Sequence, residues 1–133
     1  MRVMLDSNII ISAVVFGSKP MLDIIDRLLD EYKFVLCSYI IDELRRTFDK
    51  KFPAKTGDLE EFLDEMPFEL FCTPHTLPKH NLFTIRDEKD EKILYSAILA
   101  DVDILVTGDK DLLVVEGIER PEILSHLEFL GKY

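Results

Sequence analysis

Four acidic side chains stand where alternating strands and helices would bring them together. Asp6 and Asp109 each follow a short apolar run typical of a buried strand. Glu43 and Asp90 lie near the starts of predicted helices. In a β-α-β sheet, the carboxyl ends of the strands and the amino ends of the following helices share one rim, where ligands usually bind. We therefore predict that these four acids converge on one site.

The chemistry expected of such a site is that of a hard divalent cation. Crowded carboxylates repel one another, so they bind protons more tightly or bind cations. Oxygen ligands without a suitable Cys or His favour Mg²⁺ or Mn²⁺. One or two such ions can orient a water, lower its pKa and offset charge on a phosphodiester during in-line displacement.

Three further polar residues accompany the four acids. Asn8 is placed to orient Asp6 or a metal-bound water, and Thr107 to hydrogen-bond an acid or a phosphate. Each can equally satisfy backbone groups at the end of a strand. Asp111 is a weaker fifth acid, for which a role in a turn is about equally expected.

The elements that must position these residues alternate along the chain. Strands are predicted at residues 2–5, 34–37, 68–72, 104–106 and 123–124. Apolar residues at helical spacing predict helices that begin near residues 9, 20, 38, 58 and 88, and a terminal helix at 127–130. The alternation indicates an α/β fold, in which right-handed crossovers build a mostly parallel sheet with helices on both sides.

Each acid also has a purely structural interpretation. Asp87 can cap a helix in which Asp90 completes a capping-box-like start, and Asp109 can be a turn residue. Glu43 can instead form a surface pair with Arg46 or Thr47, which lie three and four residues further along the same helix. Ser7 or Asn8 is expected to cap the first helix, and Ser38 the third.

The formal net charge of −10 excludes a protein that grips nucleic acid by a generally basic surface. One dense basic cluster stands out against it, formed by Arg45, Arg46, Lys50 and Lys51. The cluster either complements the dipole at the end of its helix or lines a path for phosphates beside the acids.

Length and composition predict one domain over residues 1–133 with a substantial core, since 47% of the residues are hydrophobic. Cys37 and Cys72 lie in separate apolar runs without zinc-type spacing. We expect both to be buried free thiols of a cytoplasmic protein. No segment is long enough to cross a membrane, and Asp6 and Asn8 interrupt the apolar start.

Four motifs in order resemble the PIN domain family over nearly the whole chain. They are Asp6-Ser-Asn-Ile-Ile-Ile-Ser-Ala13, Ser38 to Leu44, Arg86-Asp-Glu-Lys-Asp-Glu-Lys-Ile93 and Leu105-Val-Thr-Gly-Asp-Lys-Asp-Leu112. More narrowly, the chain is similar to the VapC-like toxin components of prokaryotic toxin–antitoxin pairs. The resemblance implies a three-layer α/β/α sandwich, a Mg²⁺- or Mn²⁺-dependent endoribonuclease acting on an RNA substrate, a homodimer, and a cognate antitoxin that blocks the acidic site.

The family's acids match Asp6, Glu43, Asp90 and Asp109 in that order, and its usual polar positions match Asn8 and Thr107. Two departures leave these ligands in place. Glu88 stands where many relatives have Pro, and Ser125-His126 stands where a Ser/Thr-Pro pair often follows the last strand.

Three rival interpretations remain at this stage. The first is a catalytically silent PIN-like module that binds RNA or protein. A receiver-like phosphoacceptor domain would require paired acids after the first strand and an acid after the third, whereas a single Asp6 follows Leu5 and Thr73-Pro74 follows the third strand. A phosphatase for small molecules would be expected to carry a phosphate-cradling loop, and the sequence contains none.

Overall fold

The computed structural model describes residues 1–133. Its elements are β1 (Arg2–Leu5), α1 (Ser7–Phe16), α2 (Lys19–Glu31), β2 (Lys33–Cys37), α3 (Ser38–Lys51), the 3₁₀ turn η1 (Pro53–Lys55), α4 (Thr56–Glu65), β3 (Phe68–Phe71), α5 (Glu88–Leu99), β4 (Ile104–Val106), α6 (Lys110–Leu113), β5 (Glu122–Leu124) and α7 (His126–Lys132). Every predicted strand and helix is present, with small shifts at the ends. The single turn of α6 was not predicted.

The five strands form one sheet in the order β3-β2-β1-β4-β5, and every neighbouring pair is parallel. The chain starts in the middle at β1, adds β2 and β3 on one side, and then returns to add β4 and β5 on the other. The direction of growth therefore reverses beside β1. A reversal of this kind leaves a crevice at the carboxyl ends of the two central strands.

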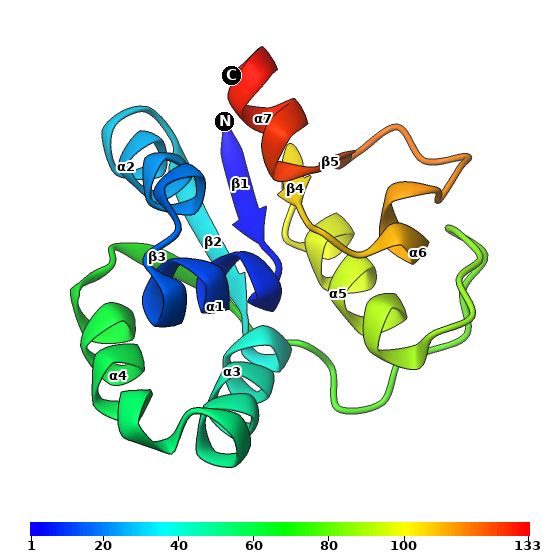
Figure 1. Ribbon diagram of the computed structural model, residues 1–133. Helices are drawn as coiled ribbons and strands as arrows, with labels where there is room; N and C mark the ends of the chain where they lie inside the picture. Colours follow the sequence, from blue (N-terminus) through cyan, green and yellow to red (C-terminus); the bar gives the residue numbers. More distant parts are fainter.

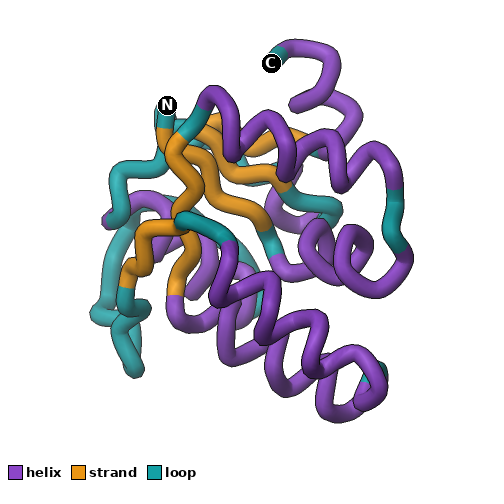
Figure 2. The backbone as a smooth tube through the Cα atoms, turned by 90° about the vertical axis from the view of Figure 1, so that its left-hand side faces the viewer, coloured by secondary structure: helices purple, strands orange, loops and turns teal.

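Helices cover both faces of the sheet, as Figures 1 and 2 show. One layer contains α1 to α4 together with α7, which returns to pack against α2. The other contains α5 and α6, which pack against each other. This is the expected three-layer α/β/α sandwich, and it follows from right-handed crossovers that advance first in one direction and then in the other.

The central strands are buried so completely that their ends have defined positions. Val3, Met4 and Leu5 of β1 have no exposed surface, and the three residues of β4 are at most 1% exposed. The residues that directly follow these strands therefore lie where the apolar core ends, at the rim of the sheet. A charged group there is costly unless it is paired or binds an ion.

Two helix caps differ from the prediction. Asp6, rather than Ser7 or Asn8, caps α1, because its backbone stays extended and its carboxylate accepts a hydrogen bond from the Ser7 amide. Cys37 occupies the cap position of α3, and no side chain caps that helix. Ser38 instead accepts a hydrogen bond from the Thr73 amide at 2.8 Å, which ties the start of α3 to the segment after β3.

Both cysteines are free thiols, but only Cys37 is buried. The prediction that Cys72 is buried is wrong, because β3 is an edge strand that ends at Phe71, one residue before it. As for membrane insertion, no single helix combines the length and apolar character of a membrane span, and α1 and α2 meet that test only as a pair bent by 113°.

Candidate metal centre

Asp6 lies at the carboxyl end of β1 with both carboxylate oxygens occupied. Oδ1 accepts a hydrogen bond from the Ser7 amide, and Oδ2 accepts one from the Thr107 hydroxyl, each at 2.7 Å. The side chain is only 2% exposed. Burial raises the pKa of Asp6, and the two hydrogen bonds lower it only in part. Two hydrogen bonds thus fix the position of the Asp6 carboxylate and offset part of the cost of burying its charge.

Glu43 also has partners for both oxygens. It lies on α3 at 8% exposure, where Oε1 accepts a hydrogen bond from the Ser7 hydroxyl and Oε2 lies 3.1 Å from Lys89 Nζ. The alternative of a surface pair with Arg46 is therefore wrong. Ser7 contacts both Asp6 and Glu43, so one hydroxyl links α1, α3 and the end of β1.

Lys89 occupies an unusual place for a cation, the first turn of a helix, where the helix dipole disfavours positive charge. Burial lowers its pKa, but the charges of Glu43, Asp6 and Asp90 outweigh this, so that the pKa is raised overall. The acids thus explain a lysine that the helix alone would disfavour. Its position in the first turn is the sequence signal by which it could have been found.

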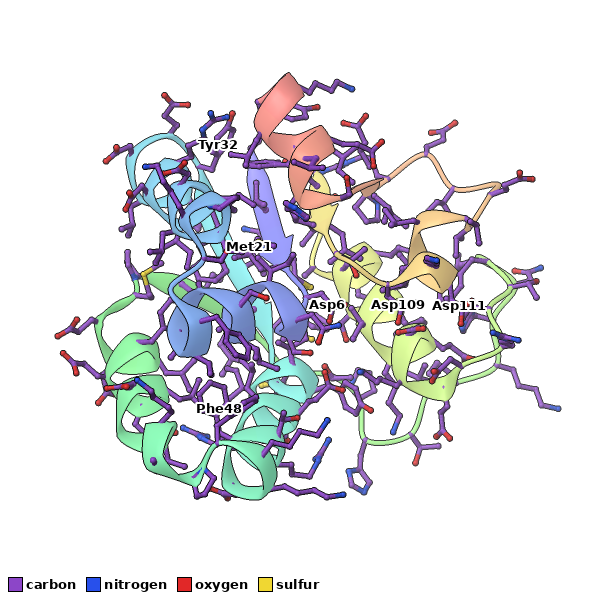
Figure 3. All side chains as sticks on the ribbon, viewed as in Figure 1. Asp6, Met21, Tyr32, Phe48, Asp109 and Asp111 are labelled. Carbon is purple, nitrogen blue, oxygen red and sulfur yellow. The ribbon has the colours of Figure 1, made fainter.

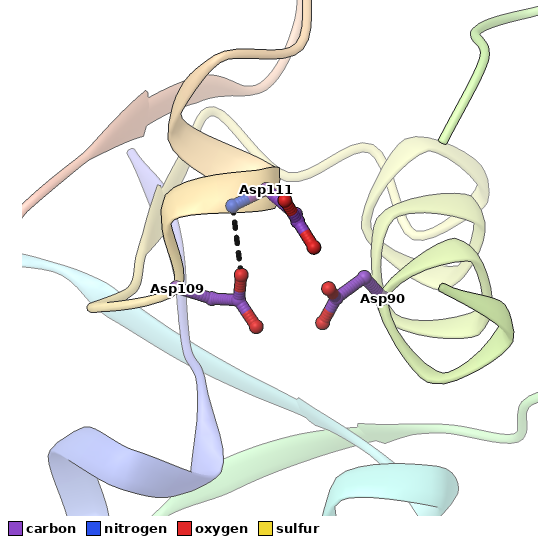
Figure 4. A group of neighbouring side chains, drawn as sticks. All are labelled: Asp90, Asp109 and Asp111. Carbon is purple, nitrogen blue, oxygen red and sulfur yellow. Dashed lines mark hydrogen bonds between the residues drawn. The ribbon is translucent and has the colours of Figure 1, made fainter. Parts of the chain in front are cut away.

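Asp90 is the one buried acid of the site whose carboxylate has no hydrogen-bond partner. The residue has no exposed surface, and neither Oδ1 nor Oδ2 has a hydrogen-bond partner. Its carboxylate points toward Asp109 and Asp111 (Figure 4). Burial, with the nearby charge of Asp109 adding to it, raises the pKa of Asp90 to about 7. The capping interpretation holds for Asp87, which accepts a hydrogen bond from the Lys89 amide, but not for Asp90.

Asp109 and Asp111 complete this half of the site. The Asp109 carboxylate caps α6 by accepting a hydrogen bond from the Asp111 amide at 2.8 Å (Figure 4). The Asp109 amide in turn donates to the Thr107 hydroxyl at 3.0 Å. Figure 3 shows Asp6, Asp109 and Asp111 on the same edge of the sheet. Thr107 therefore connects the two halves, because it bonds Asp6 through its hydrogen and Asp109 through its oxygen.

The arrangement has the composition of a divalent cation site. One oxygen from each of Asp90, Asp109 and Asp111 can be chosen so that all lie within 4.8 Å of one another. The set contains only carboxylates, which hard cations prefer. A buried carboxylate with no donor is the feature that a bound cation would satisfy. The residues present therefore fit a divalent metal ion.

The structure divides the four predicted acids rather than placing them at equal distances. Asp90 and Asp109 lie together with Asp111, which the sequence ranked lower and which also pairs with Arg86 at 3.5 Å. Asp6 and Glu43 form the half that Ser7, Thr107 and Lys89 compensate. Asn8 is exposed and makes no hydrogen bond to Asp6.

The four residues of the predicted basic cluster have different surroundings. Arg45 forms two hydrogen bonds with Glu60, at 2.8 and 3.2 Å, across to α4. Arg46 lies over the Tyr39 ring, and Lys50 and Lys51 are exposed in the last turn of α3. Binding of RNA by these four residues remains a prediction.

Known proteins provide two findings. A family model described as PIN domain matches residues 2–111. A chain in the crystal structure of VapBC2 from Rickettsia felis, bound to a DNA fragment from their promoter, is similar in fold with a TM-score of 0.70. The two chains are 20% identical, and the similarity covers 93% of this chain and 97% of that one. No curated protein matches the sequence.

We expect Asp90→Asn to stabilise the metal-free protein at alkaline pH. The folded-state pKa of about 7 lies above the ordinary value of 3.8, so the native carboxyl becomes progressively more unfavourable as the pH rises between them. The gain in the free energy of unfolding should grow over that interval to about 4 kcal/mol and level off above it, since each pKa unit corresponds to about 1.4 kcal/mol. Urea denaturation across the pH range measures it.

Asp26→Asn, on the exposed side of α2, is the matched control and should show no such pH-dependent gain. Added Mn²⁺ should stabilise the parent more than the Asp90→Asn variant, because only the parent keeps the full ligand set. If the free energies of unfolding of parent and variant change in parallel with pH, the ionised Asp90 carboxylate does not destabilise the folded protein.

Thr107→Val tests the connection between the two halves of the site. The substitution keeps the shape but removes the donor to Asp6 and the acceptor for the Asp109 amide. The free energy of unfolding should fall by about 1–3 kcal/mol, because buried polar groups lose their partners. Thr76→Val, at an exposed position, should change it by less than about 0.5 kcal/mol. Equal effects of the two substitutions in chemical denaturation would exclude the bridging role.

Proposed function

Because the chain belongs to the PIN domain family, we propose that it is a metal-dependent endoribonuclease that hydrolyses RNA phosphodiester bonds. The observation that carries the proposal is the Asp90 carboxylate, buried without a partner and directed at two more acids. Its place beside the reversal in strand order is where an open α/β sheet offers a crevice for a substrate.

In this proposal the acids divide into two roles. Asp90 and Asp109, with Asp111 beside them, hold the cation, which we assign as Mg²⁺ or Mn²⁺ from the all-carboxylate set. Such an ion supplies an activated water and offsets charge on the phosphodiester. Asp6 and Glu43 complete the catalytic set from the opposite side.

The surrounding residues keep the second pair of acids in position. Thr107 fixes the orientation of Asp6, and Ser7 with Lys89 fixes that of Glu43. Lys89 also keeps positive charge beside the acids, which reduces the repulsion that an approaching phosphate would meet. Asn8 lies two residues after Asp6 and is exposed, so its proposed role is to contact the attacking water or the substrate.

We further propose that the protein is the toxin of a toxin–antitoxin pair and that a cognate antitoxin covers the acidic site. The similarity of fold to a chain of the VapBC2 structure supports this assignment. A homodimer and a cytoplasmic location, both expected from the sequence, remain predictions.

The direct test is cleavage of a mixed pool of structured and single-stranded RNA, with Mg²⁺, Mn²⁺ or EDTA, by protein freed of any bound antitoxin. The parent should cut only with a divalent ion. Asp6→Asn and Asp90→Asn should each reduce cleavage by more than about 100-fold, because the loss of even an outer-shell partner typically costs 10–100-fold. Asp26→Asn should cut like the parent.

Two outcomes would contradict this assignment. A parent that binds Mn²⁺ but cuts no RNA would favour the catalytically silent binding module. Cleavage that persists in both variants, or in EDTA, would place the activity outside these acids.

A further inference from the structure

A small cavity of about 240 Å³ lies beside the acidic site, between the start of α3 and the face of α5. Its lining includes Ser38 and Thr73, which follow β2 and β3. The cavity is therefore at the same carboxyl edge of the sheet as the acids, above the neighbouring pair of strands. Its remaining lining residues are Tyr39, Asp42, Arg46, Pro74, His75 and Lys92.

Two cations in this cavity share one aromatic ring. The guanidinium carbon of Arg46 lies 5.9 Å from the centroid of Tyr39, and Lys92 Nζ lies 5.2 Å from it. Contacts of this kind attract a cation to the ring face and restrict a long side chain. Tyr39 thus holds both positive charges at the cavity, although they come from different helices.

These charges are largely free to meet an anion. Arg46 forms no ion pair, and Lys92 pairs only with the highly exposed Glu88, at 3.7 Å. An exposed pair at that distance contributes little. Arg45, one residue away on α3, is instead held by two hydrogen bonds to Glu60. One carboxylate, Asp42, also lines the cavity, but it is exposed to solvent.

The cavity and the acidic site are neighbours along both helices. Tyr39 and Glu43 are four residues apart on α3, and Lys92 and Lys89 are three apart on α5, so each pair lies on one helix face. The Glu43–Lys89 ion pair is therefore the part of the acidic site that lies next to the cavity. An RNA strand bound across the acids would reach the cavity about one helical turn further along, a distance of ~5.4 Å.

We propose that this cavity binds a backbone phosphate of the RNA strand adjacent to the phosphate that is cleaved. Arg46 and Lys92 neutralise it, and the Ser38 hydroxyl, which accepts from the Thr73 amide, has its own hydrogen to donate. In a chain of net charge −10, a polyanion needs such a local site. This inference rests on the proposed ribonuclease function and names the residues that position its substrate.

The test measures binding of a fluorescein-labelled single-stranded RNA of mixed sequence by anisotropy, with Asp90→Asn as the background to prevent cleavage. Adding Arg46→Gln or Lys92→Gln should weaken binding roughly three- to tenfold and lower the slope of log K against log salt by about one. Lys19→Gln, an exposed lysine on α2, is the control and should retain the background affinity.

Two further comparisons separate a phosphate site from general charge effects. Arg45→Gln should weaken binding less than Arg46→Gln, because Glu60 already holds Arg45. Tyr39→Phe should retain affinity, since the ring still orders both cations, whereas Tyr39→Leu should lose it.

The assignment fails if Arg46→Gln and Lys92→Gln bind like Lys19→Gln. If the parent nevertheless cleaves RNA, the ribonuclease proposal stands and only the cavity is excluded. If the background protein binds no RNA and the parent cuts none, both proposals fail. Binding of labelled polyglutamate that is lost on Arg46→Gln, together with RNA binding that this substitution leaves unchanged, would assign the cavity to an acidic peptide and contradict the RNA assignment.

Discussion

Repulsion between the buried Asp90 carboxylate and the half-buried acids beside it is the constraint on which the rest of this structure depends. Asp90 has no exposed surface and no donor, and it faces Asp109 and Asp111 across a short gap. An isolated buried charge of this kind is strongly unfavourable in a protein interior. The surrounding structure compensates Asp6 and Glu43 but leaves Asp90 for a ligand. The site is thus organised around one buried carboxylate that lacks a hydrogen-bond donor or a cation.

The fold makes this concentration of charge feasible. The sheet is continuous and apolar through its centre, so Asp6 and Thr107 emerge from β1 and β4 at fixed neighbouring positions. Thr107 then joins the two halves through one hydroxyl. Since β1 and β4 flank the reversal in strand order, buried central strands position the residues that most need precise placement.

The sequence predicts much of the fold because its signals are local. Short apolar runs and helical spacing locate all five strands, and the alternation of elements implies the parallel sheet. The acids at the rim follow from that topology. The Glu43–Lys89 pair does not, because it joins residues 46 positions apart through side-chain conformations that only packing determines. The different surroundings of Arg45 and Arg46 are hidden for the same reason, since Glu60 and Tyr39 approach them from other parts of the fold.

The most direct measurement is anomalous X-ray diffraction from crystals of the protein grown with Mn²⁺. The account predicts an anomalous peak bound by the carboxylates of Asp90 and Asp109, with Lys89 still paired to Glu43. It also predicts that the peak is absent from crystals of Asp90→Asn. A peak held elsewhere, or an Asp90 carboxylate that stays without a ligand at saturating Mn²⁺, would contradict the central claim that this acid is buried to bind a cation.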